Sequence, residues 1–379
     1  MSELSYLEKL LDGTEVEWKA LGDVTSVLRG KRLTKNLLSA EEKFPVFHGG
    51  LEPLGYYNKS NRPANTVMII NVGASAGTVG YSTVDFWSSD GCFCLEHNEL
   101  LNNRFLYFAL IGYQSLLKSK VRVAGIPTLD AIVVNKLLIP IPCPENPEKS
   151  LAIQLEIVRV LDKFTALTAE LTAELTARKK QYNYYRDRLL SFEGKEVEWR
   201  ALGEVLNMRA GQHISASKIM SSPNDECSYP CFGGNGVRGF VKDKSHNGEH
   251  LLIGRQGALC GNVQRMKGMF YATEHAVVVT AGNEIDVDWA FHMLSAMNLN
   301  QYASQSAQPG LAVGKIQTLK IPLPCIETQK KTAKILDKFD TLTNSITEGL
   351  PREIELRQKQ YEYYRDLLFS FPKPDSVTN

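Results

Sequence analysis

Two sets of loops in this 379-residue chain carry the residue types that bind nucleic acid. Arginine and lysine pair with phosphates or with guanine O6 and N7, asparagine and glutamine form bidentate pairs with adenine, and adjacent glycines let backbone approach a duplex. Candidates in the first half are Arg29, Lys31, Arg32, His48, Lys59, Asn61, Arg62 and Arg122. Candidates in the second half are Arg209, Gln212, His213, Asn235, Arg238, Lys242, Lys244, Arg255 and Gln256. Each residue alone is better explained as a solvated surface group, but their joint occurrence at matching positions of two halves favours nucleic acid.

Recognisable catalytic arrangements are missing from the sequence. It holds no Asn/Asp-Pro-Pro-Tyr/Phe tetrapeptide of the kind found in base-amino methyltransferases. The segment Gly310–Ile316 resembles a phosphate-binding loop, but it is one residue short and lacks the Ser or Thr that meets magnesium. Cys92 with Cys94, and Cys227 with Cys231, lack partner pairs, so we interpret them as core residues rather than zinc ligands. We therefore expect a non-catalytic chain with no metal site.

Composition is that of an ordinary globular protein. Lys and Arg number 43 against 42 Asp and Glu, and 43% of residues are hydrophobic, which argues against a free-standing, strongly basic nucleic-acid binder. At roughly 150 residues per domain the length predicts two to three domains. The odd count of seven cysteines, a charged N-terminus and the lack of an apolar run of about 18 residues favour a cytoplasmic protein without a membrane span.

An internal duplication organises the chain. Four blocks of the first half return in the same order in the second half, with few changes. The pairs are Glu15–Gly22 with Glu196–Gly203, Ile139–Cys143 with Ile321–Cys325, Leu161–Phe164 with Leu336–Phe339, and Gln181–Asp187 with Gln360–Asp366. Between these constant blocks only sparse signals align: Phe44-Pro45 with Tyr229-Pro230, Phe47 with Phe232, and Gly73 and Gly77 with Gly257 and Gly261. The duplication predicts two similar halves related by a pseudo-dyad.

Two constant segments are predicted to form long helices. Residues 150 to 191 contain no Gly or Pro and carry a mostly apolar heptad seam, which at 1.5 Å per residue gives a helix of roughly 60 Å. A second helix is predicted from about 328 to 370, interrupted at Gly349-Leu350-Pro351. Two such helices, each following a similar globular unit, predict an antiparallel coiled coil that holds the units apart.

A tandem four-residue repeat lies in the first of these helices. Thr168-Ala169-Glu170-Leu171 is followed at once by Thr172-Ala173-Glu174-Leu175. Each copy adds about 6 Å and slightly more than one helical turn, so its copy number would shift one globular unit against the other. The competing interpretation is a run that merely favours helix. On the first interpretation Thr168, Leu171, Thr172 and Leu175 mark a spacer.

The variable segments are predicted to be mixed α/β. Short β-rich runs at 66–70 and 276–279 alternate with Gly-, Asn- and Ser-rich loops, and helices are expected at 104–118 and 289–299. Residues 6–11 resemble 185–190, so the N-terminus is expected to pack beside the C-terminal helix and close the molecule into a ring. The predicted class is α+β, divided into an N-terminal tail (1–14), domain 1 (15–149), a central helix (150–192), domain 2 (193–326), a C-terminal helix (327–371) and a disordered tail (372–379).

The constant blocks resemble one family. The duplicated Glu-Val-Glu-Trp, Ile-Pro-x-Pro, Leu-Asp-Lys-Phe and Gln-Tyr-x-Tyr-Tyr-Arg-Asp blocks, Gln154 and Gln329 near the helix starts, and the Thr-Ala-Glu-Leu tandem are similar to the specificity (S) subunit of type I restriction-modification enzymes, closest to the group called IC. The resemblance covers essentially the whole chain. It implies two target-recognition domains that each recognise one half of a split DNA sequence, and conserved helices that space them and bind two modification (methyltransferase) subunits.

The resemblance also implies further partners and the location of chemistry. Two restriction (translocase-nuclease) subunits would join the complex on double-stranded DNA, and those partners rather than this chain would handle S-adenosylmethionine, ATP and Mg²⁺. The tandem repeat would set the gap between half-sites. Because the variable domains differ most between members, the resemblance implies no base specificity.

Two alternatives stay open at this point. The first is a non-catalytic coiled-coil adaptor whose paired domains bind protein or RNA, which predicts no salt-dependent, sequence-specific footprint from the assembled complex. The second is an enzyme with an unrecognised nucleophile, such as Cys92 or Cys260, which predicts turnover by the purified chain without partners.

Overall fold

The computed structural model describes residues 6–194, 196–257, 259–305 and 309–373. The chain forms two compact units. Unit 1 comprises Met1–Glu170 with Ile354–Asn379, and unit 2 comprises Leu171–Glu353. Each unit therefore contains one variable segment together with parts of the long helices.

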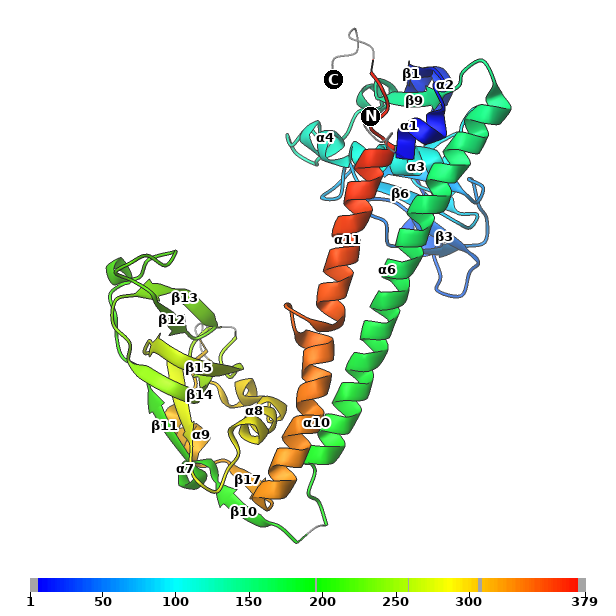
Figure 1. Ribbon diagram of the computed structural model, residues 1–379. Coiled ribbons are helices and arrows are strands. Elements are labelled where there is room, and N and C mark those ends of the chain that lie inside the picture. Colours follow the sequence, from blue (N-terminus) through cyan, green and yellow to red (C-terminus); the bar gives the residue numbers. More distant parts are fainter. Residues whose placement is uncertain (1–5, 195, 258, 306–308, 374–379) are drawn as a thin grey trace. The chain divides into compact units, whose positions relative to one another are not determined.

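Three antiparallel or mixed sheets form the body of unit 1 (Figure 1). A four-stranded sheet has the order β2-β8-β5-β6, a three-stranded sheet the order β4-β3-β7, and β1 pairs with β9. Strand β5 is buried along its whole length, which agrees with the apolar run at residues 67–70. The strands are β1 (Val16–Ala20), β2 (Val27–Arg29), β3 (Phe44–Phe47), β4 (Gly55–Tyr57), β5 (Thr66–Ile70), β6 (Val79–Ser82), β7 (Trp87–Ser88), β8 (Cys92–Leu95) and β9 (Leu138–Pro142).

Short helices complete unit 1. The segment predicted as one helix over 104–118 forms two, because the chain turns at Tyr113. The main hydrophobic core joins the four-stranded sheet to α3 and to the long helix, with Phe105 and Leu161 fully buried in it. The helices are α1 (Tyr6–Leu11), α2 (Leu21–Val24), the 3₁₀ helix η1 (Lys35–Leu37), α3 (Asn103–Gly112), α4 (Gln114–Ser119) and α5 (Ala131–Asn135).

A six-stranded sheet dominates unit 2. Its order is β11-β16-β14-β15-β12-β13, and β10 pairs separately with β17. The strands are β10 (Glu198–Ala201), β11 (Leu206–Ala210), β12 (Tyr229–Gly233), β13 (Gly236–Val241), β14 (His246–Gly254), β15 (Val263–Ala272), β16 (Ala276–Ala281) and β17 (Lys320–Leu323). The shorter helices are α7 (Leu202–Val205), η2 (Ala216–Lys218), α8 (Val287–Ala296), η3 (Leu299–Tyr302) and α9 (Val313–Gln317). Trp289 and Leu336 are fully buried in the main core of the unit.

Both units repeat the same backbone frame. Gly73 and Gly257 have φ of 88° and 86°, and Gly77 and Gly261 have φ of 86° and 87°. A Cβ on Gly77 would lie 2.8 Å from the backbone N of Lys118, and one on Gly261 would lie 2.4 Å from that of Asn300, so neither turn accepts a side chain without a shift of the neighbouring backbone. The sparse glycine alignment therefore marks a shared loop structure.

The long helices follow the predicted pattern. Helix α6 runs without a break from Pro147 to Leu190, whereas the second is divided into α10 (Ile326–Asn344) and α11 (Gly349–Leu368). The interruption covers residues 345–348, directly before the predicted Gly-Leu-Pro, and α11 begins at Gly349, which has a φ of 79°. None of the helices within the described ranges has the length and apolar character needed to cross a membrane.

The constant blocks pair the long helices in the same way in each unit. In unit 1, Phe164 of α6 stacks on Tyr364 of α11 with ring centroids 5.2 Å apart, and the two helices run in opposite directions (Figure 1). In unit 2, Phe339 of α10 stacks on Tyr185 of α6 at 5.7 Å. Thus each Leu-Asp-Lys-Phe block contacts a Gln-Tyr-x-Tyr-Tyr block, and the predicted coiled-coil pairing is confirmed.

The described ends of the chain meet in unit 1. Leu7 and Leu11 of α1 are buried in the same core as Leu368 and Phe371. The indole Nε1 of Trp18 donates to the carbonyl of Pro372 at 2.8 Å. The disorder predicted from residue 372 onward therefore does not apply to Pro372, and residues 374–379 of that predicted tail lie outside the described residues.

Candidate nucleic-acid interface

A hollow of about 470 Å³ in unit 1 brings three predicted residues together. Arg29, Arg32 and His48 line it, with Asp90 on the same wall. His48 Nδ1 lies 3.4 Å from Asp90 Oδ1, and Arg29 Nε donates to the Asp90 carbonyl at 3.2 Å. Exposed cationic groups are therefore gathered at one concave surface, as a phosphate- or base-contacting site requires.

Close backbone packing positions this loop. A Cβ on Gly30 would lie 2.1 Å from the carbonyl oxygen of Ser89, so only glycine lets the loop lie against the segment after β7. The Lys31 N–H donates to the Ser88 carbonyl, and Trp87 Nε1 donates to the Lys31 carbonyl. The backbone of Lys31 is thereby fixed while its side chain stays exposed.

Two predicted residues of unit 1 are used inside the fold. The Asn61 amide donates to the Ser88 carbonyl at 3.0 Å and accepts from the Ser88 N–H at 2.7 Å, so both of its polar atoms are engaged. Arg62 donates to the carbonyls of Asn61 and Arg29. These residues hold the loops of the site, and the Asn61 amide is not free for the base pairing that its residue type suggested.

The remaining candidates of unit 1 lie on its surface. Lys59 is exposed. Arg122 pairs with Asp130 at 3.2 Å. Within the described ranges, the side chains of Lys31, Arg32 and Lys59 form no ion pair, so these cations remain available for phosphates.

In unit 2 a hollow of about 640 Å³ includes two predicted residues, His213 and Lys242. His213 Nδ1 lies 3.0 Å from Glu274 Oε1, and 79% of the His213 side chain is exposed. A Cβ on Gly211 would lie 2.4 Å from the carbonyl oxygens of Ala272 and Thr273, which repeats the contact of Gly30 in unit 1. The loop after β11 is therefore built like the loop after β2.

Other candidates of unit 2 surround this frame. Arg238 of β13 packs its side chain over Gly233, and a Cβ on Gly233 would lie 2.6 Å from the Cδ of Arg238. Asn235 is exposed in the hairpin turn between β12 and β13. Arg255 donates to the Glu274 carbonyl at 3.2 Å, and the Lys244 ammonium contacts the Met269 sulfur. The three others are exposed at the ends of strands or in loops: Arg209, Gln212 and Gln256.

Sequence reasoning missed the acidic members of these sites. It considered basic and amide residues, whereas Asp90 and Glu274 lie beside the candidate histidines. Burial of Glu274 opposes its ionisation, but the hydrogen bond from His213 and one from the backbone outweigh it and lower the pKa of Glu274. The signal that could have found these residues is their position, since each lies two residues before a buried strand, β8 in unit 1 and β16 in unit 2.

The spacer residues lie on the continuous helix α6. The Thr168 hydroxyl donates to the Phe164 carbonyl at 2.9 Å, a bond that satisfies a β-branched polar side chain within a helix. Leu171 and Leu175 are half-buried and Thr172 is exposed. The repeat therefore forms regular helix, as the spacer interpretation requires.

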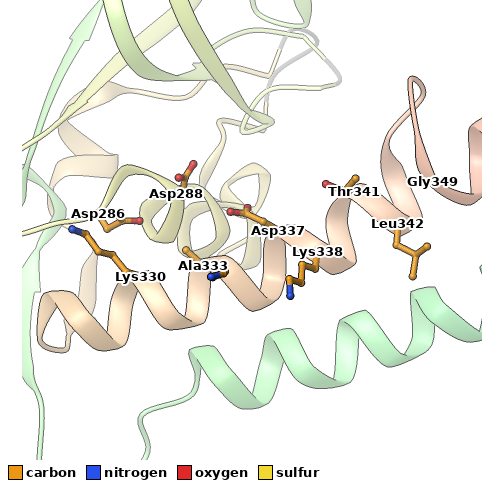
Figure 2. A pocket seen from close by; sticks show the side chains of 10 residues that line it. Asp286, Asp288, Lys330, Ala333, Asp337, Lys338, Thr341, Leu342 and Gly349 are labelled. Carbon is orange, nitrogen blue, oxygen red and sulfur yellow. The ribbon is translucent and has the colours of Figure 1, made fainter.

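A third hollow, of about 580 Å³, lies along α10 in unit 2 (Figure 2). None of the predicted residues lines it. Its acidic residues already have structural roles: the Asp286 side chain accepts from the Trp289 N–H at the start of α8, and Asp337 pairs with Arg265 and His292. Burial raises the pKa of Asp288 in the same wall. The arrangement fits a joint between α8 and α10.

Comparison with known proteins decides the family. The model of the type I restriction-modification DNA specificity domain matches twice, over residues 14–178 and 194–356. The chain belongs to this family of specificity subunits. It is 53% identical over 375 residues to the specificity subunit of the type I restriction enzyme EcoprrI of Escherichia coli, covering 92% of this chain and 93% of the relative. It is 39% identical to the EcoR124I/EcoR124II specificity subunit of the same species, covering 100% of both chains.

A solved structure supports the fold. The crystal structure of the type I restriction-modification S subunit from M. genitalium superposes with a TM-score of 0.67 at 20% identity, covering 98% of this chain and 99% of that chain. The predicted family and the α+β class with long helices are confirmed. Its relatives are specificity subunits, so the chain is a non-catalytic DNA specificity subunit, and neither the adaptor nor the enzyme alternative is favoured.

Proposed function

We propose that this chain selects a two-part DNA target for a methyltransferase, with unit 1 recognising one part and unit 2 the other. The observation that carries the proposal is the duplicated frame. In each unit a glycine loop packs against the same turn and brings basic side chains to a concave surface. Two units with the same backbone frame and different surface residues would recognise a target made of two different short sequences.

Partner subunits supply the chemistry in this proposal. Two modification subunits dock on the long helices and two restriction subunits join them, and S-adenosylmethionine, ATP and Mg²⁺ act on those partners. The relatives are specificity subunits of type I restriction enzymes, which supports such an assembly. Because the chain carries a net charge of only +1, much of the phosphate neutralisation falls to the partners, and the chain alone should bind DNA weakly.

Helix α6 supplies the spacing. Its 44 residues correspond to about 66 Å, which is enough to reach major grooves one to two turns of DNA apart. The target is then two short blocks separated by a gap of fixed length whose sequence is not recognised.

Methylation mapping tests this proposal. The chain is expressed with its methyltransferase subunit in a host that lacks such a system, and modified bases in the genomic DNA are located by sequencing. We expect one two-part motif that is absent when this chain is omitted. Methylation with a single continuous motif, or with no motif, contradicts the proposal.

A further inference from the structure

Asp90 and Glu274 occupy the same place in the two units. In each unit, the residue before the acid donates its backbone N–H to a carbonyl near the end of a strand, β3 in unit 1 and β12 in unit 2. The residue two positions after the acid donates its backbone N–H to the carbonyl of the residue before the acid. The bonds are Ser89 N to Phe47 O at 2.9 Å and Cys92 N to Ser89 O at 3.1 Å in unit 1, and Thr273 N to Phe232 O at 2.9 Å and Ala276 N to Thr273 O at 3.0 Å in unit 2. Both acids thus lie on one repeated turn.

An arginine binds the backbone of each acid. Arg29 Nε donates to the Asp90 carbonyl and an Arg255 guanidinium N–H donates to the Glu274 carbonyl, both at 3.2 Å. These arginines come from different positions, because Arg29 ends β2 whereas Arg255 follows β14. The same contact is therefore built twice from unrelated parts of the sequence.

A histidine faces each carboxylate. His48 Nδ1 lies 3.4 Å from Asp90, and His213 Nδ1 lies 3.0 Å from Glu274. His48 follows β3, whereas His213 lies in the loop after β11, so these two residues are again not equivalent. Divergent loops that both retain an arginine, a carboxylate and a histidine around one turn indicate a shared task.

Each carboxylate keeps an oxygen without a donor. Asp90 Oδ1 accepts from the Ser89 hydroxyl at 3.1 Å, whereas within the described ranges no donor reaches Oδ2. Glu274 Oε2 is enclosed and has no hydrogen-bond partner in the same ranges. About a third of each side chain is exposed, 33% for Asp90 and 31% for Glu274. Unmet buried acceptors are rare in native proteins, and rotation of the partly exposed Glu274 side chain would bring this oxygen to a donor on a ligand.

We propose that Asp90 and Glu274 are specificity-determining residues, each accepting a hydrogen bond from the exocyclic amino group of a cytosine or adenine in the major groove of its half-site. This inference rests on the proposed function. Phosphates repel a carboxylate, so an acid at a phosphate-binding surface weakens binding unless a base supplies a donor. The amino groups at cytosine N4 and adenine N6 are the donors that the major groove presents, and carboxylates accept from them. The neighbouring arginine offsets the repulsion and holds the backbone of the acid in place.

The test uses the full complex of this chain with its methyltransferase subunit. The wild-type motif is mapped first, and binding is then measured on duplexes carrying every single base-pair change in each half-site. The variants are Asp90→Ala, Asp90→Asn, Glu274→Ala and Glu274→Gln. Matched controls are Glu52→Ala in unit 1 and Asp225→Ala in unit 2, both exposed acids outside the two hollows.

We expect each alanine variant to lose discrimination at one base pair by about 5- to 150-fold, in one half-site only. The isosteric amides retain an oxygen acceptor and add a donor, so they should change the preferred base at that same position. Glu52→Ala and Asp225→Ala should leave both half-sites unchanged. These results support the inference.

Two outcomes overturn the inference. The first is an even loss of affinity at all positions, which indicates a purely structural role for the acids. The second is an unchanged motif in complexes that assemble and bind normally. If an alanine variant does not assemble, the amide variant, whose shape is conserved, decides between these outcomes. Failure of the proposed function is distinguishable, since the wild-type complex itself would then yield no two-part motif.

Discussion

The guanidinium of Arg104 lies 2.7 Å from the carboxylate of Asp162 and joins α3 to the long helix α6 in unit 1. It also lies 4.8 to 4.9 Å from three aromatic rings, those of Tyr81, Tyr107 and Phe108. Asp162 belongs to the first Leu-Asp-Lys-Phe block. The contact therefore links the recognition domain to the constant part of the chain.

Unit 2 also joins its recognition domain to the long helix by an arginine–aspartate pair, but the arginine lies on a different element. Arg104 of α3 and Asp288 of α8 are at equivalent positions, because each is two residues after the N-cap of its helix. The arginine comes instead from β15, where Arg265 pairs with both Asp288 and Asp337. Arg265 lies opposite Leu251 in its sheet, as Tyr81 lies opposite Val67 in unit 1. Each unit therefore pairs the aspartate of its Leu-Asp-Lys-Phe block with an arginine, which comes from helix α3 in unit 1 and from strand β15 in unit 2.

We expect Arg104→Ala and Asp162→Asn each to destabilise unit 1. Because both side chains are partly exposed, the coupling between them should be only about 0.5–2 kcal/mol. Arg104→Ala should cost more than Asp162→Asn because it also loses the aromatic contacts. Urea unfolding of the single and double variants measures the coupling, with Lys163→Ala as an exposed control on the same helix.

A charge swap sharpens this test. Arg104→Asp places two carboxylates together and should be the most destabilising single variant. Adding Tyr81→Arg recreates the arrangement of unit 2 and should recover part of the lost stability. Absence of recovery would indicate that the two joints are not equivalent.

Gln154 and Gln329 should be among the most sensitive residues of the constant blocks. Both are fully buried. The Gln154 amide accepts from the Asn102 N–H and donates to the Leu100 carbonyl, and the Gln329 amide does the same with Asp286 and Glu284. Gln154→Leu leaves a buried donor and acceptor unmet and should lower the free energy of unfolding by about 2–4 kcal/mol.

The measurement is chemical denaturation of the purified chain, with Gln329→Leu as the parallel change in unit 2. Gln358→Leu is the matched control, since that side chain is exposed and donates to the neighbouring Glu362 at 2.9 Å. Equal midpoints for all three variants would show that the two buried amides do not fix the domains to the helices.

Sequence alone was sufficient for features that repeat or follow a period. The heptad seam predicted α6 to within a few residues, and the Gly-Leu-Pro segment predicted the break between α10 and α11. These features depend on local backbone chemistry and on burial of a helix face, which sequence periodicity records.

Features that depend on contacts between loops could not be predicted. The internal role of Asn61 follows from the position of Ser88, which only the folded chain reveals. Arg104 and Arg265 have the same role but lie on different elements, α3 and β15, so an alignment of the two halves does not pair them. Asp90 and Glu274 were not predicted because basic and amide side chains alone were taken as base-contacting types, although a carboxylate also accepts from a base amino group.

His292 gives unit 2 a pH dependence. Its ring is fully buried, with Nε2 2.8 Å from Asp337 Oδ1 and 3.2 Å from Arg265. Burial disfavours the imidazolium more than Asp337 favours it, so the pKa of His292 lies below its ordinary value of 6.5. The unfolded chain then binds the proton more readily, and stability present above pH 6.5 is lost as the pH falls below it.

Urea midpoints measured from pH 8 to pH 5 should fall less steeply in His292→Gln than in the wild type. Some slope remains because burial also lowers the pKa of His246 in the same unit. His213→Gln is the control, since that ring is largely exposed. An identical slope in His292→Gln and the wild type would contradict the assignment.

Lys179 and Lys180 test the docking of methyltransferase on α6. Both are exposed on the unit 2 part of the helix. Lys179→Glu with Lys180→Glu should weaken assembly with the methyltransferase subunit at low salt, while the two-part motif of any complex that forms stays the same. Lys218→Glu, on the surface of the recognition domain, should leave assembly unchanged. Normal assembly of the double variant would remove these lysines from the partner surface.

The copy number of Thr-Ala-Glu-Leu should set the gap of the target. A third copy inserted after Leu175 lengthens α6 by about 6 Å, and at about 3.4 Å per base pair the gap should grow by about one to two base pairs. Both half-sites should stay unchanged, because the insertion touches neither hollow. Methylation mapping measures gap and half-sites together. Insertion of Ala-Ala-Ala-Ala at the same place separates length from sequence: an equal gap in both variants assigns the effect to length, whereas an unchanged gap in both rejects the spacer role.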